Sequence, residues 1–324
     1  MNQVIYTSPY VPAEWITSFG LSPSRVLLGS QDYNPTDSTG GTCPFVSRYI
    51  QETGQINNSS LFVFTTECDQ MRRGFENPAE ETRQRSFLMN IPATWNTPES
   101  HNLYLMELKR LGRFLEKHGG NSPAEDKLTE FMREFEKLRL MLKAQRNRVS
   151  AREFSEIIAE FHRTGHIKPK PDENRGESED TPIALLGGPL TSPDFKLFDI
   201  IAENGGRVVL DGTETGERTL PSSFDREKII SDPLRELARA YFESIPDAFR
   251  RPNIKLYEWI KRTFRERGVE GVILVRRIWC DVWHGEVGRL REYVDVPLLD
   301  IDLDGDIPYA RIKTRIQAFM ETLQ

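Results

Sequence analysis

The sequence predicts an α/β protein with two parallel-sheet halves and a helical segment between them. Strand-like apolar runs alternate with helical patterns over residues 1–97 and again over residues 182–324. The run Leu61–Phe64 is apolar without interruption, which is typical of a strand buried on both faces of a parallel sheet. The chain has 324 residues, which corresponds to two domains at roughly 100–200 residues per domain.

The first half, residues 1–97, reads as strands and helices in turn. Pro12 lies near the first turn of a helix that Gly20 ends, and Pro44 opens a helix that ends at Gly54. A further helix is expected from about Gln70. The strands expected in this half are Gln3–Tyr6, Arg25–Gly29 and Leu61–Phe64.

Residues 98–165 form the predicted helical segment, and residues 166–181 the linker that follows it. Apolar residues recur at helical spacing, which favours a core-facing stripe over a cofactor site. Asn121–Pro123 restarts a helix, and Ser150 with Glu153 forms a capping box. The stripe consists of Leu103, Met106, Leu108, Leu111, Phe114, Leu115, Leu128, Phe131, Met132, Phe135, Leu138 and Leu142. The linker is polar and contains two prolines and no apolar anchor.

The second half, residues 182–324, resumes the alternation. The expected strands are Ile183–Leu186, Arg207–Gly212, Val272–Trp279 and Pro297–Asp302. The expected helices are Phe195–Glu203, Leu234–Phe242, Ile254–Arg267, His284–Tyr293 and Arg311–Leu323.

Composition excludes several classes of protein. The 43 Lys and Arg residues against 49 Asp and Glu give a net charge of −6. The sequence has no basic stripe of the kind that binds nucleic acid. The longest apolar run of the C-terminal half, Val272–Val275, is far shorter than the ~20 residues that span a bilayer. The first residues lack the pattern of a secretory signal. We therefore expect a cytoplasmic protein with neither a membrane nor a nucleic acid as partner.

The three cysteines, Cys43, Cys68 and Cys280, occupy similar places in the predicted fold. Cys68 and Cys280 stand where a buried strand ends and a helix begins, and Cys43 opens a helix. Ligands bind beyond the carboxyl ends of strands in open α/β sheets, and helix N-termini favour anions and thiolates. Three unrelated buried thiols are the alternative. The repeated placement favours a metal site in the cleft between the halves.

Spacing alone does not identify the metal. Zinc would need a fourth ligand, for which His284, four residues after Cys280, is the best candidate. A [4Fe-4S] cluster held by three thiolates would leave one iron open to substrate or solvent. The sequence has no second set of cysteines for another cluster.

The chain resembles the cluster-bearing subunits of 2-hydroxyacyl-CoA dehydratases and of the related benzoyl-CoA reductases. The similar stretches surround all three cysteines and run in family order over nearly the whole chain. They are Pro12–Glu14, Thr42–Phe45, Glu67–Arg73, Asn90–Pro92, Glu107–Leu111, Gly206–Asp211, Gly216–Arg218, Trp279–Asp281, Val296–Leu299 and Thr314–Phe319.

This resemblance implies two Rossmann-like halves with one [4Fe-4S] cluster held by the matching Cys43, Cys68 and Cys280. It also implies an acyl-CoA substrate, a related family subunit in a homo- or heterodimer, and a separate iron–sulfur ATPase as activator. In the dehydratases, one electron forms a ketyl radical at the thioester carbonyl, the hydroxyl leaves toward the open iron, and the electron is returned. In the reductases, the electrons stay in the product.

Two other functions remain open for such a chain. One is a non-catalytic electron-relay or assembly subunit of a larger iron–sulfur complex, which fits a chain shorter than typical members. The other is a structural zinc protein. No G-x-S-x-G, Walker A or G-x-G-x-x-G motif is present, so serine-hydrolase, P-loop and dinucleotide-binding functions lose their main support.

Further candidate residues are weighed against a purely structural role. Ser30 and His284 are the catalytic candidates: Ser30, with Gln31, follows a predicted strand toward the open iron, and His284 is a cluster neighbour or proton donor. Gly187–Pro189 is either a phosphate-binding turn or an ordinary one, and Thr213–Arg218 is expected to face the cleft. Arg72 and Arg73 either neutralise cluster or CoA charge or belong to a solvated helix face. Asp300, Asp302, Asp304 and Asp306 lack calcium-loop spacing and are read as a strand edge and turn.

Overall fold

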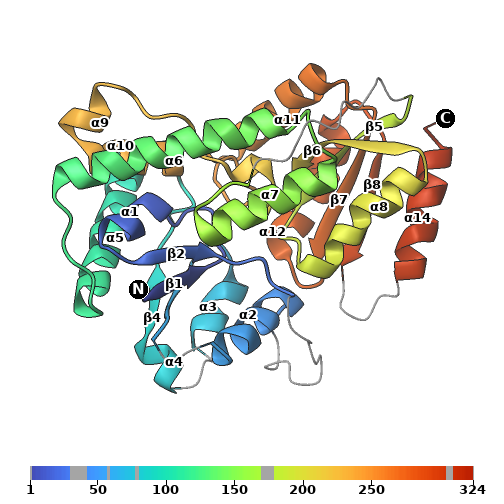
Figure 1. Ribbon diagram of the computed structural model, residues 1–324. Helices are drawn as coiled ribbons and strands as arrows, with labels where there is room; N and C mark the ends of the chain where they lie inside the picture. The colour runs from blue at the N-terminus through green and yellow to red at the C-terminus, as the bar shows by residue number, and fades with distance from the viewer. Residues whose placement is uncertain are drawn as a thin grey trace.

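The computed structural model describes residues 2–29, 42–56, 59–76, 80–168, 179–303 and 309–323. Within these residues the chain forms two four-stranded sheets, and every strand pairing in them is parallel. The strand orders are β2-β1-β3-β4 and β6-β5-β7-β8, so both sheets have the same order relative to the chain (Figure 1). The predicted fold class, with two Rossmann-like parallel-sheet halves, is confirmed.

The first sheet has a fully buried strand near its centre. Its strands are β1 (Gln3–Tyr6), β2 (Ser22–Arg25), β3 (Leu61–Thr65) and β4 (Ser86–Met89). Its helices are α1 (Ala13–Ser18), α2 (Pro44–Gly54), α3 (Asp69–Glu76) and α4 (Glu80–Gln84). All five residues of β3 are buried, as its continuous apolar run predicts.

The position predicted for the second strand, Arg25–Gly29, is wrong. Pairing with β1 covers Ser22 to Arg25, and only the N–H of Val26 adds a bond, to the Tyr6 carbonyl. The next residues leave this sheet toward the second half, where the N–H of Ser192 donates to the Leu28 carbonyl at 2.7 Å. Leu27 of the apolar run packs against the core of the second half, whereas Val26 and Leu28 pack in the first half's own core. Strand β4 was not predicted because it is short and its apolar residues do not stand out from their surroundings.

Three long helices follow the first sheet, as predicted. They are α5 (Pro98–Lys117), α6 (Glu125–Gln145) and α7 (Ala151–Thr164). Ser150 and Glu153 form the expected capping box at the start of α7. The predicted stripe is partly wrong, because Leu103 and Met106 are 49% and 62% exposed, whereas Leu108, Leu111 and Leu115 are buried. None of the helices in the described ranges combines the length and apolar character that crossing a bilayer requires.

The second sheet has longer strands than the first, and seven helices lie in the same part of the chain within the described residues. Its strands are β5 (Thr181–Gly187), β6 (Gly206–Gly212), β7 (Gly271–Arg277) and β8 (Leu298–Leu303). The helices are α8 (Lys196–Glu203), α9 (Lys228–Ser231), α10 (Pro233–Phe242), α11 (Ile254–Arg267), α12 (Asp281–His284), α13 (Val287–Tyr293) and α14 (Tyr309–Glu321). The single helix predicted over His284–Tyr293 is two helices, and α12 starts directly after Cys280.

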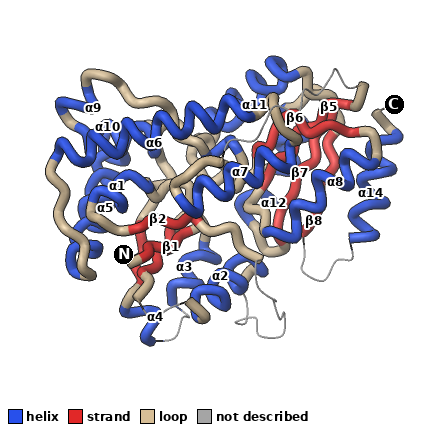
Figure 2. The backbone as a smooth tube through the Cα atoms, viewed as in Figure 1, coloured by secondary structure: helices blue, strands red, loops and turns tan. Residues whose placement is uncertain are grey.

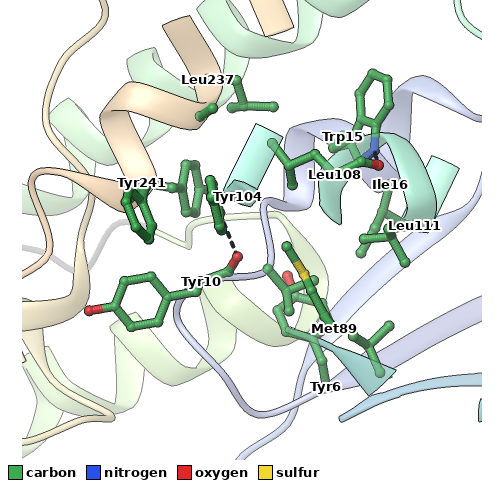
Figure 3. Close-up of a cluster of buried hydrophobic side chains, with 14 of the residues drawn as sticks. Tyr6, Tyr10, Trp15, Ile16, Met89, Tyr104, Leu108, Leu111, Leu237 and Tyr241 are labelled. Carbon is green, nitrogen blue, oxygen red and sulfur yellow. Dashed lines mark hydrogen bonds between the residues drawn. The ribbon is translucent and has the colours of Figure 1, made fainter. Parts of the chain in front are cut away.

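Helix α10 lies with the first sheet, although it follows the second sheet's first two strands in the chain (Figures 1 and 2). Leu237 and Tyr241 of α10 belong to the same buried cluster as Tyr10 and Tyr104 (Figure 3). The Tyr104 hydroxyl donates to the Tyr10 carbonyl at 2.7 Å, and the Tyr104 ring stacks on Phe242. The second part of the chain therefore completes the core of the first half, which holds the two halves in contact. The boundaries at 97, 165 and 181 stay predictions.

Candidate functional site

Each cysteine lies at the start of a helix, as predicted. Cys43 is the N-cap of α2, Cys280 is the N-cap of α12, and Cys68 directly precedes α3. Strand β3 ends three residues before Cys68, and β7 ends three residues before Cys280. The carboxyl ends of two buried parallel strands thus supply two of the thiols, and the start of α2 supplies the third.

The fold brings the three thiols into one region between the halves. Cys68 lies close enough to Cys43 and Cys280 for the charge of either to raise its pKa, and Cys43 acts on Cys280 in the same way. Cys43 is 7% exposed, and Cys68 and Cys280 are half-buried. Residues 43, 68 and 280 therefore form one cluster, which we call the thiol cluster.

Burial and helix N-termini act on these thiols in opposite directions. Burial raises the pKa of all three thiols, that of Cys280 to about 12. Backbone N–H groups in the first turn of each following helix lower these pKa values: Val46 acts on Cys43, Met71 on Cys68 and Trp283 on Cys280. Burial has the larger effect, so the thiols are protonated at neutral pH. A positively charged centre would be needed to hold them as thiolates.

The donor set can be tested against a single metal ion. Within the described ranges, no three His, Cys, Asp or Glu side chains are placed to hold one ion. Zinc requires every thiolate sulfur about 2.3 Å from one point. In an iron–sulfur cube each thiolate binds a different iron, so the sulfurs lie farther apart. The described residues thus contain no donor group that is already arranged for a single ion.

A group of buried charges lies beside the thiol cluster and joins the two halves. Arg25, at the end of β2, donates to the carbonyls of Thr7 at 2.7 Å and Glu214 at 2.5 Å, and to Thr219 Oγ1 at 3.0 Å. Arg218 donates to Asp247 Oδ2 at 2.8 Å and is fully buried. Arg25 thus connects the first sheet to the segment after β6.

Two carboxyl groups of this charge group come from different halves, and one raises the pKa of the other. Glu67 comes from the first half and Glu214 from the second. Burial raises the pKa of both, and Glu67 is the strongest nearby charge that raises the pKa of Glu214. Asp247 also acts on the pKa of both glutamates, so the group contains three carboxyls. Arg25 and Arg218 are the cations that act on them. Like charges in a buried site favour a proton on one of the acids.

The structure places the other candidate residues as follows. His284 is exposed and does not complete a three-donor group with the thiols in the described part of the chain. Ser30 and Gln31 lie outside the described residues. Arg72 and Arg73 are both exposed. The roles of Ser30 and His284 stay predictions.

The glycine turn and the aspartates have structural explanations. Gly187 has φ +131°, and a Cβ there would lie 1.8 Å from the Val275 carbonyl oxygen. Strand packing therefore requires glycine at this position. Asp300 and Asp302 form ion pairs with Arg276 at 3.0 and 2.5 Å, which agrees with a strand edge. Asp304 and Asp306 lie outside the described residues.

The sequence did not indicate Arg25 and Asp247 as site residues, and it indicated Glu67 only as part of a motif. It did expect Thr213–Arg218 to face the cleft, and that segment supplies Glu214 and Arg218 to the buried charge group. A useful signal was available: Arg25 ends a strand, and Glu67 follows one by two residues. Asp247 carries no such local signal.

Comparisons with known proteins assign the chain to a family. The family model described as "2-hydroxyglutaryl-CoA dehydratase, D-component" matches residues 9–323. No curated protein matches the chain. Among solved structures, the laminin-binding protein Lbp of Streptococcus pyogenes is 11% identical, with 100% of this chain and 99% of that chain covered, at a TM-score of 0.23. A mutant of the laminin-binding adhesin Lmb from Streptococcus agalactiae is 11% identical, with 100% of both chains covered, also at 0.23. At these TM-scores, neither likeness carries an argument.

Proposed function

The chain belongs to the 2-hydroxyglutaryl-CoA dehydratase D-component family, and on that premise we propose that it is the [4Fe-4S] subunit of a 2-hydroxyacyl-CoA dehydratase or a related acyl-CoA reductase. Cys43, Cys68 and Cys280 would hold the cluster. What supports this proposal is that the three cysteines, 25 and 212 residues apart in the chain, lie close enough to affect one another's charge.

When bound, the cluster supplies a single low-potential electron for ketyl-radical chemistry at the thioester carbonyl. In this proposal a separate iron–sulfur ATPase delivers that electron, and a related family subunit pairs with this chain in the cytoplasm. The chain's own residues provide the surroundings. Helix N-termini at Cys43, Cys68 and Cys280 direct N–H groups at the sulfurs and stabilise an anionic centre.

The buried charge group has two tasks in this proposal. Arg25 holds the segment after β6 against the first sheet and so helps to keep the two halves in contact. Glu67 and Glu214 supply polar groups for a substrate that enters between the halves. His284 and Ser30 remain candidates for proton transfer near the open iron.

The first experiment is metal analysis of protein purified without oxygen. We expect about four irons and four sulfides per chain, with an EPR signal after dithionite reduction. Cys43→Ser, Cys68→Ser and Cys280→Ser should each lose the cluster, whereas Ser155→Ala, a buried serine outside the thiol cluster, should keep it. Full iron content in Cys280→Ser would contradict a cluster shared by the two halves. Zinc in the wild-type protein after reconstitution would contradict the iron–sulfur assignment.

Turnover is tested with the ATPase activator, or titanium(III) citrate, as electron donor. The substrates are the CoA thioesters of lactate, 2-hydroxybutanoate, 2-hydroxyglutarate and benzoate. Formation of an enoyl-CoA from any 2-hydroxy thioester supports a dehydratase, and reduction of benzoyl-CoA supports a reductase. A cluster-loaded protein, isolated together with any family subunit that co-purifies, that converts none of the four would contradict the catalytic proposal.

One observation favours a second candidate function, that of an electron-relay or assembly subunit. No cysteine of the thiol cluster lines either of two cavities in the described residues, one lined by residues such as Arg25, Arg139 and His162 and the other by residues such as His101 and Phe242. A relay subunit needs no acyl-CoA pocket of its own. Cluster content without acyl-CoA binding, together with co-purification of a longer related chain, would support this function.

A further inference from the structure

A small cavity lies where three parts of the chain meet. Its volume is about 20 Å³, and residues of the first half, of helices α6 and α7, and of the second half line it. None of the described residues that line it is acidic. Its wall therefore carries positive charge and hydroxyl groups but no negative charge. The polar side chains of the wall are Tyr6, Arg25, Arg139, His162, Thr219 and Tyr241.

Arg25 is buried at this cavity with neutral bonding partners. It is 6% exposed, and the hydrogen bonds that it forms within the described residues end on neutral atoms, namely backbone carbonyls, a threonine hydroxyl and the His162 ring. Glu67 and Glu214 act on its charge from a longer distance, and neither forms an ion pair with it in the described chain. A buried guanidinium normally has an anion as partner, because an unpaired charge is costly to remove from water.

Arg139 supplies a second cation with a donor to spare. It is 4% exposed, and one of its terminal nitrogens donates to Glu14 Oε1 at 2.5 Å. The other terminal nitrogen, Nη2, has no hydrogen-bond partner among the described residues. The second oxygen of Glu14 accepts from the Tyr241 hydroxyl at 2.6 Å. Glu14 therefore compensates one arginine of the wall and leaves the other without a paired charge.

Tyr6 adds a hydroxyl group that is also unpartnered. Its side chain is 2% exposed and lines the cavity, and its Oη forms no hydrogen bond to any described residue. Buried tyrosine hydroxyls usually find a partner. The Tyr6 ring packs in the same buried cluster as Tyr241 (Figure 3), so packing holds the side chain in place without its hydroxyl group.

We propose that this cavity binds one small monovalent anion of about the size of chloride. The cavity exceeds the ~10–15 Å³ that a single water needs, and it has no room for sulfate, phosphate or a thioester. A water would satisfy the free donors but would leave the charge of Arg25 unpaired. The uncompensated positive charge therefore favours an anion over a water.

The anion would connect the two halves. Arg25 ends β2 of the first sheet, Arg139 lies on α6, and Thr219 follows β6 of the second sheet. One ion held by donors from these segments would be bound by the folded chain and released on unfolding. Stability should therefore depend on the concentration of the anion.

The first test is urea unfolding with chloride replaced by gluconate at constant ionic strength, because gluconate is too large for the cavity. In the wild type, about 100 mM chloride should lower the equilibrium constant of unfolding about 10-fold, which corresponds to a dissociation constant of about 10 mM. A constant that does not change with chloride would overturn the proposal.

Tyr6→Phe locates the effect. It removes a donor that bonds no described residue, so the variant should fold and bind the anion about 10-fold more weakly. The same chloride concentration should then lower its unfolding constant only about 2-fold. Tyr293→Phe is the matched control, since Tyr293 is 37% exposed and does not line the cavity, and it should keep the full effect. An equal chloride effect in Tyr6→Phe and the wild type would place the anion elsewhere and overturn the proposal.

A crystal of the wild type grown with bromide gives a direct answer that needs no variant. Bromide carries the same charge as chloride and scatters X-rays anomalously. An anomalous peak beside Tyr6 and Arg139 is the expected result. A water in the cavity, without an anomalous peak, would overturn the proposal.

Discussion

In the first half, the end of β3 supplies Glu67 and Cys68, and hydrogen bonds from the first half's own hydroxyl groups hold Glu67. In the second half, the segment after β6 supplies Glu214, whose carboxylate has no such partner among the described residues, and the end of β7 supplies Cys280. Both sheets have the same strand order and the same all-parallel pairing. The two halves therefore have the same sheet topology but contribute differently bonded carboxyl groups after their strands.

The two halves also differ in backbone strain, which lies in the second half, directly before Cys280. Trp279, directly before Cys280, has φ +67° and is 66% exposed, whereas the first half has no non-glycine residue at positive φ within its described part. A bulky side chain at positive φ is uncommon and costs about 1–2 kcal/mol. The first half is thus the better-satisfied side of the cleft. Substitutions in the two halves should therefore differ in their effect on stability.

Two glycines at positive φ should respond differently to alanine. Gly187→Ala in the second half should cost more than about 4 kcal/mol, because the new Cβ would overlap the Val275 carbonyl of the neighbouring strand. Gly20→Ala in the first half should cost about 1–2 kcal/mol, since only the φ of +75° opposes it and no atom lies within 4 Å. Urea denaturation of both variants measures the difference. Equal costs would mean that β7 moves away at little expense.

Removal of Arg218 should destabilise the fold almost as much. Arg218→Met leaves the carboxylate of Asp247 buried without its cation, and it also removes the guanidinium that lies over the Trp283 ring. The expected cost is about 3–5 kcal/mol. Arg235→Met, which breaks an exposed pair with Asp232, is the control and should change stability by less than about 1 kcal/mol. Similar values for the two variants in thermal or urea unfolding would contradict a buried charge pair at the cleft.

His162 should make stability depend on pH below neutrality. Burial, with the charges of Arg25 and Arg139, holds its pKa well below the usual value, so the folded protein keeps the imidazole neutral. The unfolded chain binds a proton near pH 6.5. Stability from this residue is therefore complete above about pH 6.5 and falls by up to about 1.4 kcal/mol per pH unit below it.

The measurement is the urea midpoint from pH 7.5 to 5.5. His162→Gln should flatten its decline, because glutamine has no proton to gain. His166→Gln, at an exposed position just after α7, should leave the decline as in the wild type. A decline of the same slope in His162→Gln would assign the pH dependence to other groups.

The smallest effect is expected at Trp279. Trp279→Asn should change stability by less than about 1 kcal/mol, because the exposed ring contributes little packing and asparagine tolerates a left-handed backbone. Trp283→Ala, four residues on, removes a ring that is 2% exposed and should cost about 3–5 kcal/mol. Equal costs in urea unfolding would show that the Trp279 ring is packed in solution.

Local patterns made most of the fold predictable. The continuous apolar run of β3 and the capping box of α7 depend on neighbouring residues, and both were identified in place. The three cysteines were also identified from local patterns, because the residues next to each of them predict the start of a helix. Strand β2 was misplaced, since the chain leaves the sheet after Arg25, and Leu27 then packs on the second half while Leu28 packs in the first half's core. Apolar character alone does not say which neighbour an apolar residue will meet.

The sequence by itself therefore determined the class of fold, the helix starts at Cys43, Cys68 and Cys280, and the family stretches around them. The tertiary structure decided which charges share the cleft. Arg25, Glu67, Glu214 and Asp247 are separated by up to 222 residues, and contact between the two halves brings them close enough to affect one another's charge. Whether a carboxyl group is partnered or unused depends on burial and on contacts between distant segments, and neither has a local signal in the sequence.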